Sequence, residues 1–196
     1  VNDTATLAQL DAITNGNSAT ITAGDITDGA SALAADTTWI AAAQVADTIT
    51  VNNAATLTQL DDIKTQIDLG AATLVTGDIT DGYAALGTDT NGWVAAAASG
   101  DTITVNDTAT LAQLDAITNG NSATITAGDI TDGYAALGTD TNGWVAAAQA
   151  ADTITVNDTA TLAQLDAITN GNSATITAGD ITDGASALAA DTTWIA

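Results

Sequence analysis

The sequence contains no cysteine, histidine, proline, methionine or phenylalanine, and its only basic residue is Lys64. Without histidine or cysteine it has no imidazole base, no thiol nucleophile and no nitrogen or sulfur ligands for a metal. One lysine cannot form the basic surface that binds nucleic acid. No apolar run approaches the roughly 20 residues that cross a bilayer, and no signal peptide is present. These absences argue against an enzyme, a nucleic-acid-binding protein and a membrane-inserted protein.

The acidic residues are all aspartate: 24 of them against one lysine give a net charge of −23. Chains with such a charge are often disordered, but here 46 % of the residues are hydrophobic. Only 3 % are aromatic, so the apolar residues are mostly alanine, isoleucine, leucine and valine. This apolar content is too high and too regular for a disordered polyanion.

The sequence is a tandem array. A block that begins VNDTATLAQLDAI at Val1 recurs unchanged at Val105 and Val156, and a diverged copy begins at Val51. We therefore divide a single solenoid, residues 1–196, into repeats 1–50, 51–104, 105–155 and 156–196, the last one truncated. Residues 1–41 and 156–196 are identical, which gives a super-repeat of 155 residues. Because the last repeat stops in phase with the first, we expect a segment of a longer array.

The first half of each repeat predicts a strand and then a helix. Residues 47–51 alternate, with Ile49 and Val51 directed inward and two threonines outward. Residues 2–4, Asn-Asp-Thr, offer short polar side chains that can cap a helix. Leu7, Leu10 and Ile13 then recur at spacing three, and residues 15–16, Asn-Gly, end the predicted helix.

The second half predicts another alternating strand, residues 19–23, with Ile21 directed inward. Asp25 could cap a short helical turn that continues to Leu33. In the middle repeats, glycines interrupt any long helix, so residues 93–97 are predicted as a short helix or an irregular stretch. The tryptophans recur once per repeat and are expected to fill the core.

Short connections between strands that run in one direction predict a right-handed parallel α/β-solenoid with leucine-rich-repeat-like coils. We expect about two strands per 50-residue repeat and an elongated rod of roughly 40 Å, since parallel strands stack about 4.8 Å apart. Nothing in the sequence resembles a polar cap at either end. The expected partner is therefore the protein itself, in head-to-tail contacts that build a homopolymer.

Carboxylates and Asn-Gly turns repeat along the chain in a pattern that Ca²⁺ could use. Asp also caps helices and makes turns, and that reading needs no cation. No EF-hand or Ca²⁺-binding nonapeptide is present, so a bound Ca²⁺ is a possibility and no other cofactor is expected. The candidate ligands are Asp25, Asp28, Asp78, Asp81, Asp89, Asn91, Asp129, Asp132, Asp140, Asn142, Asp180 and Asp183.

Threonines alternate along the predicted strands and would form an outward ladder. The pattern is similar to that of ice-binding solenoids, but Thr is also an ordinary outward strand residue, and Val75 interrupts the ladder. Asn-Asp-Thr at residues 2–4, 106–108 and 157–159 also matches the N-glycosylation pattern, but a helix cap explains these segments without a sugar. The ladder residues are Thr20, Thr22, Thr48, Thr50, Thr102, Thr104, Thr124, Thr126, Thr153, Thr155, Thr175 and Thr177.

The segment VNDTATLAQLDAI, followed by ATIT and DITD, resembles the Thr/Ala/Asp-rich tandem repeats of giant bacterial surface proteins, cyanobacterial ones among them. The resemblance covers the whole chain and implies secretion, a location on the cell surface or in the matrix, and a structural or adhesive role.

Our leading hypothesis is thus a non-enzymatic extracellular structural protein that builds a rod or a self-assembling fibre. One alternative is the Ca²⁺-stiffened stalk of an adhesin, and a more distant one is ice binding through the threonine ladder.

Overall fold

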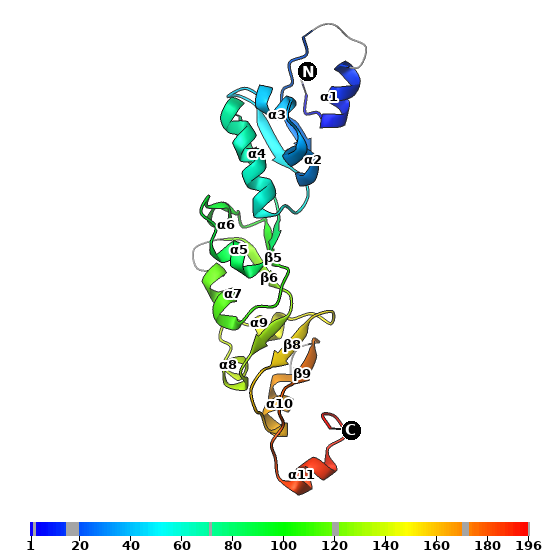
Figure 1. Ribbon diagram of the computed structural model, residues 1–196, viewed down its shortest axis with the longest axis vertical. Coiled ribbons are helices and arrows are strands. Elements are labelled where there is room, and N and C mark those ends of the chain that lie inside the picture. The colour runs from blue at the N-terminus through cyan, green and yellow to red at the C-terminus, as the bar shows by residue number, and fades with distance from the viewer. Residues whose placement is uncertain (2, 15–19, 71, 119–121, 170–172, 196) are drawn as a thin grey trace. The chain divides into compact units, whose positions relative to one another are not determined.

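A computed structural model of the protein describes residues 1, 3–14, 20–70, 72–118, 122–169 and 173–195 (Figure 1). The fold is mixed α/β with three short parallel sheets. The chain divides into two compact units. Unit 1 contains Val1–Asp81, Thr88–Thr104 and Asn121–Thr124, and unit 2 contains Gly82–Gly87, Val105–Gly120 and Ile125–Ala196. The predicted division into repeats of one solenoid stays a prediction.

Helices and strands follow one another along the chain, singly or in pairs, and α4 is the longest of them. The helices are α1 (Leu7–Thr14), α2 (Ala30–Ala35), α3 (Trp39–Ala42), α4 (Leu57–Gly70), α5 (Tyr83–Gly87), α6 (Trp93–Ala96), α7 (Leu111–Thr118), α8 (Tyr134–Gly138), α9 (Trp144–Ala147), α10 (Leu162–Thr169) and α11 (Ala185–Ala190). The strands are β1 (Ile26–Asp28), β2 (Thr48–Val51), β3 (Thr73–Val75), β4 (Ile79–Asp81), β5 (Thr102–Val105), β6 (Thr124–Ala127), β7 (Ile130–Asp132), β8 (Thr153–Val156) and β9 (Thr175–Ala178).

The strands form three separate sheets with the orders β1-β2-β3, β4-β5-β6 and β7-β8-β9. In the first sheet Ile26 pairs with Ile49, and Ile49 pairs with Leu74, all in parallel register. The third sheet repeats this register, with Ile130 paired to Ile154. Side chains of one kind are therefore stacked across neighbouring strands, since residues in register point to the same face.

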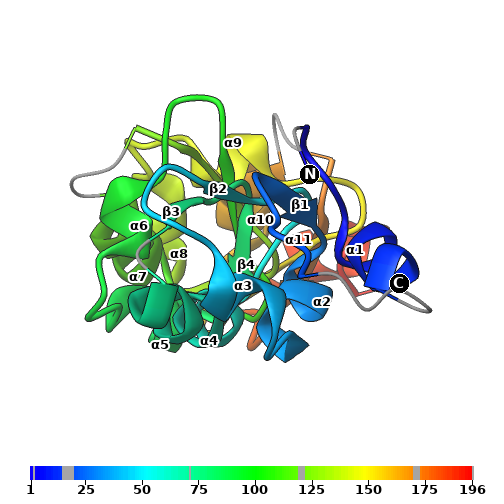
Figure 2. The same cartoon turned by 90° about the horizontal axis from the view of Figure 1, so that it is seen from above.

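The apolar residues of these strands form the core. Ile49 and Val51 are buried while Thr48 and Thr50 are half-buried, which confirms the alternation predicted for residues 47–51. In unit 1, helices α2 and α4 pack against each other and lie on the same side of the first sheet (Figure 2). Burial of isoleucine and leucine between a sheet and helices supplies the main driving force for such a fold.

A third strand in repeats 2 and 3 corrects our prediction of about two strands per repeat. Residues 26–28 form β1, where the sequence analysis expected a helical turn capped by Asp25, and the helix begins only at Ala30. The β-branched Ile26 is fully buried, and its strand pairs with β2. The same segment forms β4 and β7 in the next repeats.

The second predicted strand is present in repeats 2 to 4, as β3, β6 and β9. In repeat 1 the described part of it, residues 20–23, is not a strand. The strands β3 and β9 are paired to β2 and β8, whereas in the equivalent segment of repeat 1 the Thr22 carbonyl accepts from the N-terminal amine of Val1 at 2.7 Å. A lone strand has no ladder to stabilise it.

The predicted helix from Leu7 is confirmed as α1, and it recurs as α4, α7 and α10. Leu7 and Leu10 are buried, as their spacing predicted. Residues 15–16, predicted to end α1, lie outside the described residues. The short helix predicted around residues 93–97 is confirmed as α6.

The residue that caps α1 differs from our prediction. The Thr6 hydroxyl accepts a hydrogen bond from the Gln9 N–H at 3.2 Å, while the Gln9 side-chain oxygen accepts one from the Thr6 N–H at 2.8 Å. This reciprocal pair is a capping box, and Thr56, Thr110 and Thr161 form it with their glutamines in the other repeats. Asp3 and Thr4 precede Ala5, which makes a bridge to Ile26, so they are too far from the helix to cap it.

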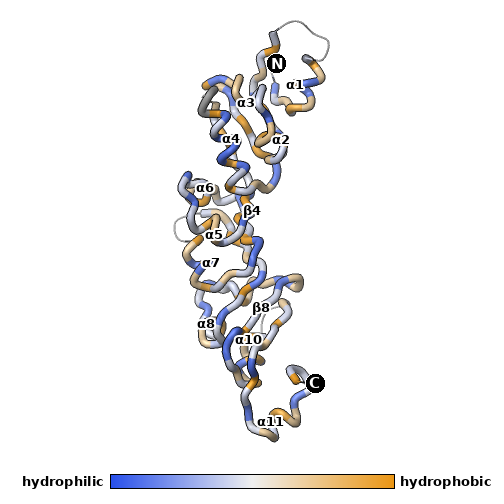
Figure 3. Tube along the Cα trace, viewed as in Figure 1, coloured by the Kyte–Doolittle hydropathy of each residue, from blue (hydrophilic) through white to orange (hydrophobic). Residues whose placement is uncertain are grey.

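Apolar and polar residues alternate at short intervals along the trace (Figure 3). Within the part of the chain that the structure describes, no helix has the length and the hydrophobicity needed to cross a membrane.

Candidate functional site

The candidate site residues are the repeated aspartates, and each type has a recurring partner. The first aspartate of the GDITDG segment accepts a hydrogen bond from the first residue of the next strand. Asp25 accepts from the Thr48 N–H at 2.8 Å, and Asp78 and Asp129 do the same for Thr102 and Thr153 at 2.7 Å. This carboxylate therefore binds the first residue of a strand that lies about one half-repeat later in the chain. Asp180, its counterpart in repeat 4, is exposed.

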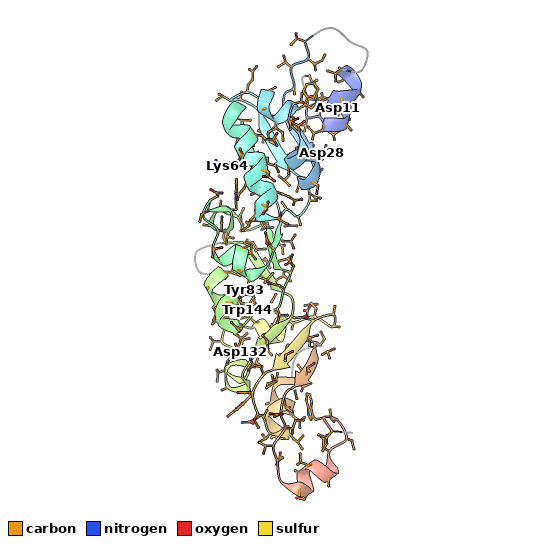
Figure 4. The ribbon with its side chains drawn as sticks, viewed as in Figure 1. Asp11, Asp28, Lys64, Tyr83, Asp132 and Trp144 are labelled. Carbon is orange, nitrogen blue, oxygen red and sulfur yellow. The ribbon has the colours of Figure 1, made fainter. Side chains whose placement is uncertain are left out.

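The second aspartate of GDITDG lies at the N-terminus of the helix that begins at Leu7 in repeat 1 and recurs as α4, α7 and α10. Asp28 Oδ2 accepts from the Leu7 N–H at 3.1 Å, and Asp28 Oδ1 accepts from the Gly29 N–H at 2.8 Å (Figure 4). A negative charge there satisfies a free N–H group and interacts favourably with the helix dipole. The same bond recurs in the other repeats, where Oδ2 of Asp81, Asp132 and Asp183 accepts from the N–H of Leu57, Leu111 and Leu162 at 3.0, 3.1 and 3.3 Å.

Asp89 and Asp140 begin the turn that leads into a tryptophan helix. Asp140 Oδ1 accepts from the N–H groups of Asn142 and Gly143, and Oδ2 accepts from Val145 at 2.8 Å. Gly143 has φ 82°, a left-handed conformation that glycine adopts without strain. The Asp89 turn is the same, so the Asp-Thr-Asn-Gly segments of the candidate calcium set are helix-initiating turns.

Repeats 1 and 4 use Asp36 and Asp191 at this position. Desolvation raises the pKa of Asp191, but the backbone N–H groups of Ile195, Trp194 and Thr193 together lower it more. The pKa of Asp191 therefore lies below its ordinary value, because the donors stabilise the ionised carboxylate.

An aspartate in α1, α4, α7 and α10 accepts a hydrogen bond from the indole N–H of the tryptophan in the same repeat. Trp144 Nε1 donates to Asp115 Oδ1 at 2.8 Å, and Asn142 Nδ2 donates to the same oxygen at 2.6 Å. Trp39, Trp93 and Trp194 pair with Asp11, Asp61 and Asp166 at 2.9, 2.7 and 3.0 Å. Trp39 and Trp144 are buried, as predicted for core residues, while Trp93 and Trp194 are half-buried. These pairs were not predicted from the sequence, although Leu-Asp and Trp recur together in every repeat.

Two Asn-Asp-Thr segments bind the N-terminus of a short helix about one half-repeat earlier in the chain, which was not predicted from the sequence. Asp107 Oδ1 accepts from the N–H of Tyr83, the first residue of α5, and Asp158 accepts from Tyr134 of α8, both at 2.9 Å. In repeat 2 the equivalent residue is Asn53, whose Oδ1 accepts from Ala30 at 2.7 Å. An uncharged amide oxygen can thus take the place of the carboxylate.

The candidate ligands for Ca²⁺ lie in these different turns and do not converge. Among the residues that the structure describes, no three acidic side chains come together where they could hold a metal ion. The oxygens of Asp28, Asp89 and Asp132 already accept backbone N–H bonds. The Ca²⁺ assignment stays a prediction, and the geometry offers these residues a structural role without a cation.

The threonine ladder follows the strands. In the third sheet Thr153 is in register with Thr175, and Thr155 with Thr177, so these side chains share one face. In the first sheet Thr48 is in register with Thr73, but Thr50 faces the exposed Val75. Thr124 and Thr126 of β6 are exposed, whereas Thr102 and Thr104 of β5 are half-buried. Thr20 and Thr22 are exposed but lie outside any strand.

No protein-family model matches the chain, and neither a curated protein nor a solved structure matches it.

Proposed function

We propose that the protein is a non-enzymatic structural repeat protein of the cell surface or extracellular matrix. In this proposal its right-handed parallel α/β coils stack as a solenoid into a rod, and rods join end to end into a fibre. The proposal makes self-association the function of the chain, and it gives the aspartates the task of holding each coil to the next.

The observation that carries the proposal is the recurrence of hydrogen bonds between side chain and backbone across one half-repeat. The bond from Leu7 to Asp28 and the bond from Leu111 to Asp132 each join residues 21 positions apart. The bonds to Asp78 and Asp107 join residues 24 positions apart. Links of nearly constant separation are typical of repeats that contact only their neighbours.

The partners of the aspartates also support a structural role. In repeat 3, all six carboxylates accept bonds from backbone N–H groups or from side chains: Asp107, Asp115, Asp129, Asp132, Asp140 and Asp152. A pair of carboxylates that hydrolyses a substrate needs oxygens directed at that substrate. Because each carboxylate has a local partner of the same kind in other repeats, turn formation and capping account for all six.

The extracellular location rests on the resemblance to the Thr/Ala/Asp-rich surface repeats and on the charge. No acidic residue whose burial is described is buried, so these groups remain in contact with solvent. A charge of −23 on one short chain is repulsive within a Debye length of about 8 Å, and salt or cations relieve that repulsion. A saline exterior would favour assembly.

Negative-stain electron microscopy at increasing protein concentration, with and without a chelator, tests the proposal. We expect rods that lengthen into filaments as concentration rises, in both buffers. Compact particles of constant size at every concentration would contradict it. Rods that stiffen only when Ca²⁺ is present would favour the adhesin stalk in its place.

A further inference from the structure

The Asn-Asp-Thr segments of repeats 3 and 4 lie on the surface between secondary-structure elements. Residues 106–108 follow β5 and residues 157–159 follow β8, and neither segment belongs to a helix or a strand. The pattern Asn-x-Thr marks an acceptor for an N-linked sugar when it lies in a surface segment of a secreted protein. The sequence left a helix cap as the other explanation of these segments.

The structure removes the helix cap as that explanation. Helix α7 is capped by Thr110, whose hydroxyl accepts from the Gln113 N–H at 3.3 Å. Helix α10 begins in the same way, with the hydroxyl of Thr161 as the acceptor. Asn106 and Thr108 precede Ala109, which makes a bridge to Ile130, so they are too far from α7 to cap it.

The contact that these segments do make needs only their middle residue. Asp107 Oδ1 accepts from the Tyr83 N–H at 2.9 Å. In repeat 2 the middle residue is Asn53, which still accepts from the Ala30 N–H, although Ala54 stands where the other repeats have threonine. The threonine is therefore not required for this contact.

The asparagine and the threonine on either side of the aspartate are accessible to solvent. Asn106, Thr108, Asn157 and Thr159 are all exposed. The strands β5 and β8 that precede them are the central strands of their sheets, so the chain already supplies a neighbouring strand on both sides. The exposure of these residues therefore does not arise from the place where the sequence begins or ends.

We propose that Asn106 and Asn157 are acceptors of N-linked glycans, which are transferred from an oligosaccharide on a lipid diphosphate. The proposal rests on the extracellular function proposed above, and it adds a covalent modification at one position of the repeat. A glycan is bulky and hydrophilic, so its acceptor must lie on the surface, as both asparagines do.

The transfer forms one bond and breaks one bond. The asparagine Nδ2 bonds to the anomeric carbon of the sugar, while the bond from that carbon to the diphosphate oxygen breaks. The lipid diphosphate leaves with the electron pair, and one amide proton passes to a base of the transferase. Asp107 takes no part in these steps, so its bond to the Tyr83 N–H remains after the sugar is attached.

Incubation of the purified, folded chain with an oligosaccharyltransferase and its lipid-linked donor tests the proposal by intact-mass spectrometry. Every protein in the test carries Asn2→Gln, because Asn2 matches the pattern but lies outside the described residues. We expect the mass to increase by one glycan at each of the two asparagines. Asn106→Gln and Asn157→Gln should each remove one glycan, and the double variant should remain unmodified.

Variants of the third residue separate recognition by the transferase from an effect on folding. Thr108→Ala should abolish the glycan at Asn106, whereas Thr108→Ser should retain it, with the same circular dichroism in both. Repeat 2 offers the matched gain, because Asn52 is exposed and lacks only the threonine. Ala54→Thr should therefore add a glycan at Asn52, which should stay unmodified without that substitution.

A folded chain that gains no glycan would overturn the proposal. Modification that occurs only after heat denaturation would overturn it as well, because the proposal requires accessible acceptors in the folded state. Retention of the Asn106 glycan in Thr108→Ala would show that the pattern is not what the transferase reads, and it would also overturn the proposal.

The protein from the cells that produce it separates this proposal from the structural function. Filaments isolated from the cell surface whose mass does not change on treatment with an N-glycosidase would overturn the glycan sites and leave the structural function standing. A glycosylated chain that forms no filaments would support the glycan sites and contradict the structural function. Glycosylated filaments would support both.

Discussion

The indole N–H of Trp144 donates to Asp115 Oδ1 at 2.8 Å. This bond joins the start of α9 to helix α7 of the same repeat. Asn142 donates to the same oxygen, so one carboxylate organises both the helix and the turn before it. Trp39, Trp93 and Trp194 have equivalent partners. A hydrogen bond to an ionised group is stronger than one between neutral groups, so this pair is a main connection between the two halves of a repeat.

Asp115→Ala should lower the free energy of unfolding by about 1–3 kcal/mol, because it leaves the indole N–H of a buried tryptophan without this acceptor. Urea denaturation followed by tryptophan fluorescence measures the effect. Asp62→Ala is the control. Asp62 is an exposed helix residue, and its substitution removes the same charge. Equal destabilisation by the two variants would contradict a specific role of Asp115.

The capping box gives a second prediction. Thr110→Ala should lower the free energy of unfolding by about 0.5–2 kcal/mol, the usual range for an N-cap threonine. Thr108→Ala, two residues earlier in the Asn-Asp-Thr segment, should change the free energy of unfolding little, because Thr108 is exposed and precedes the helix. If Thr108→Ala destabilised the protein as much as Thr110→Ala does, the assignment of the cap to Thr110 would be wrong.

These corrections show which parts of the fold the sequence determines. The alternation of Thr48 to Val51 and the spacing of Leu7 and Leu10 predicted their strand and helix, because period and burial agree there. The strand at residues 26–28 was missed, since three residues are too few to display a period. The position of the cap was missed because polar residues occupy several sites before the helix, and only the bridge of Ala5 to Ile26 places Thr6 at its start.

The roles of the aspartates were harder to predict than the elements. Asp28, Asp107 and Asp115 accept bonds from residues 21 to 29 positions away. The sequence indicated a local turn or a cation for Asp28 and a helix cap for Asp107, and it indicated no role for Asp115. A partner about one half-repeat away is determined only by how the strands pair. The repeats do indicate these pairs, because each aspartate and its partner recur together at equivalent positions.

Acid should weaken the Asp191 turn only at a pH below the ordinary pKa of aspartate. The lowered pKa of Asp191 means that its ionised form is stabilised in the folded protein. That contribution is complete above the ordinary pKa of aspartate, about 3.9, and is lost as pH falls through the lowered value. An NMR titration of the Trp194 amide, which donates to Asp191, reports it. A midpoint at or above the ordinary value would contradict the assignment.

Calcium should stabilise the protein only as a source of ionic strength. We expect the melting temperature to rise equally in CaCl₂ and MgCl₂ of the same ionic strength, because screening of the charge is not selective. Isothermal titration calorimetry should detect no saturable Ca²⁺ site. A larger rise in Ca²⁺ than in Mg²⁺, together with saturable binding, would establish the cation site that the described geometry does not form.

Deletion of residues 105–155 tests most directly whether the coils stack as independent repeats. The deletion joins Thr104 to Val156, and the block at Val156 is identical to the block at Val105, so the sequence across the junction is unchanged. A solenoid loses one repeat and remains folded, because each repeat contacts only its neighbours. We predict the same circular dichroism per residue and a cooperative, weaker unfolding transition. An unfolded or aggregated product would contradict the stacking of coils.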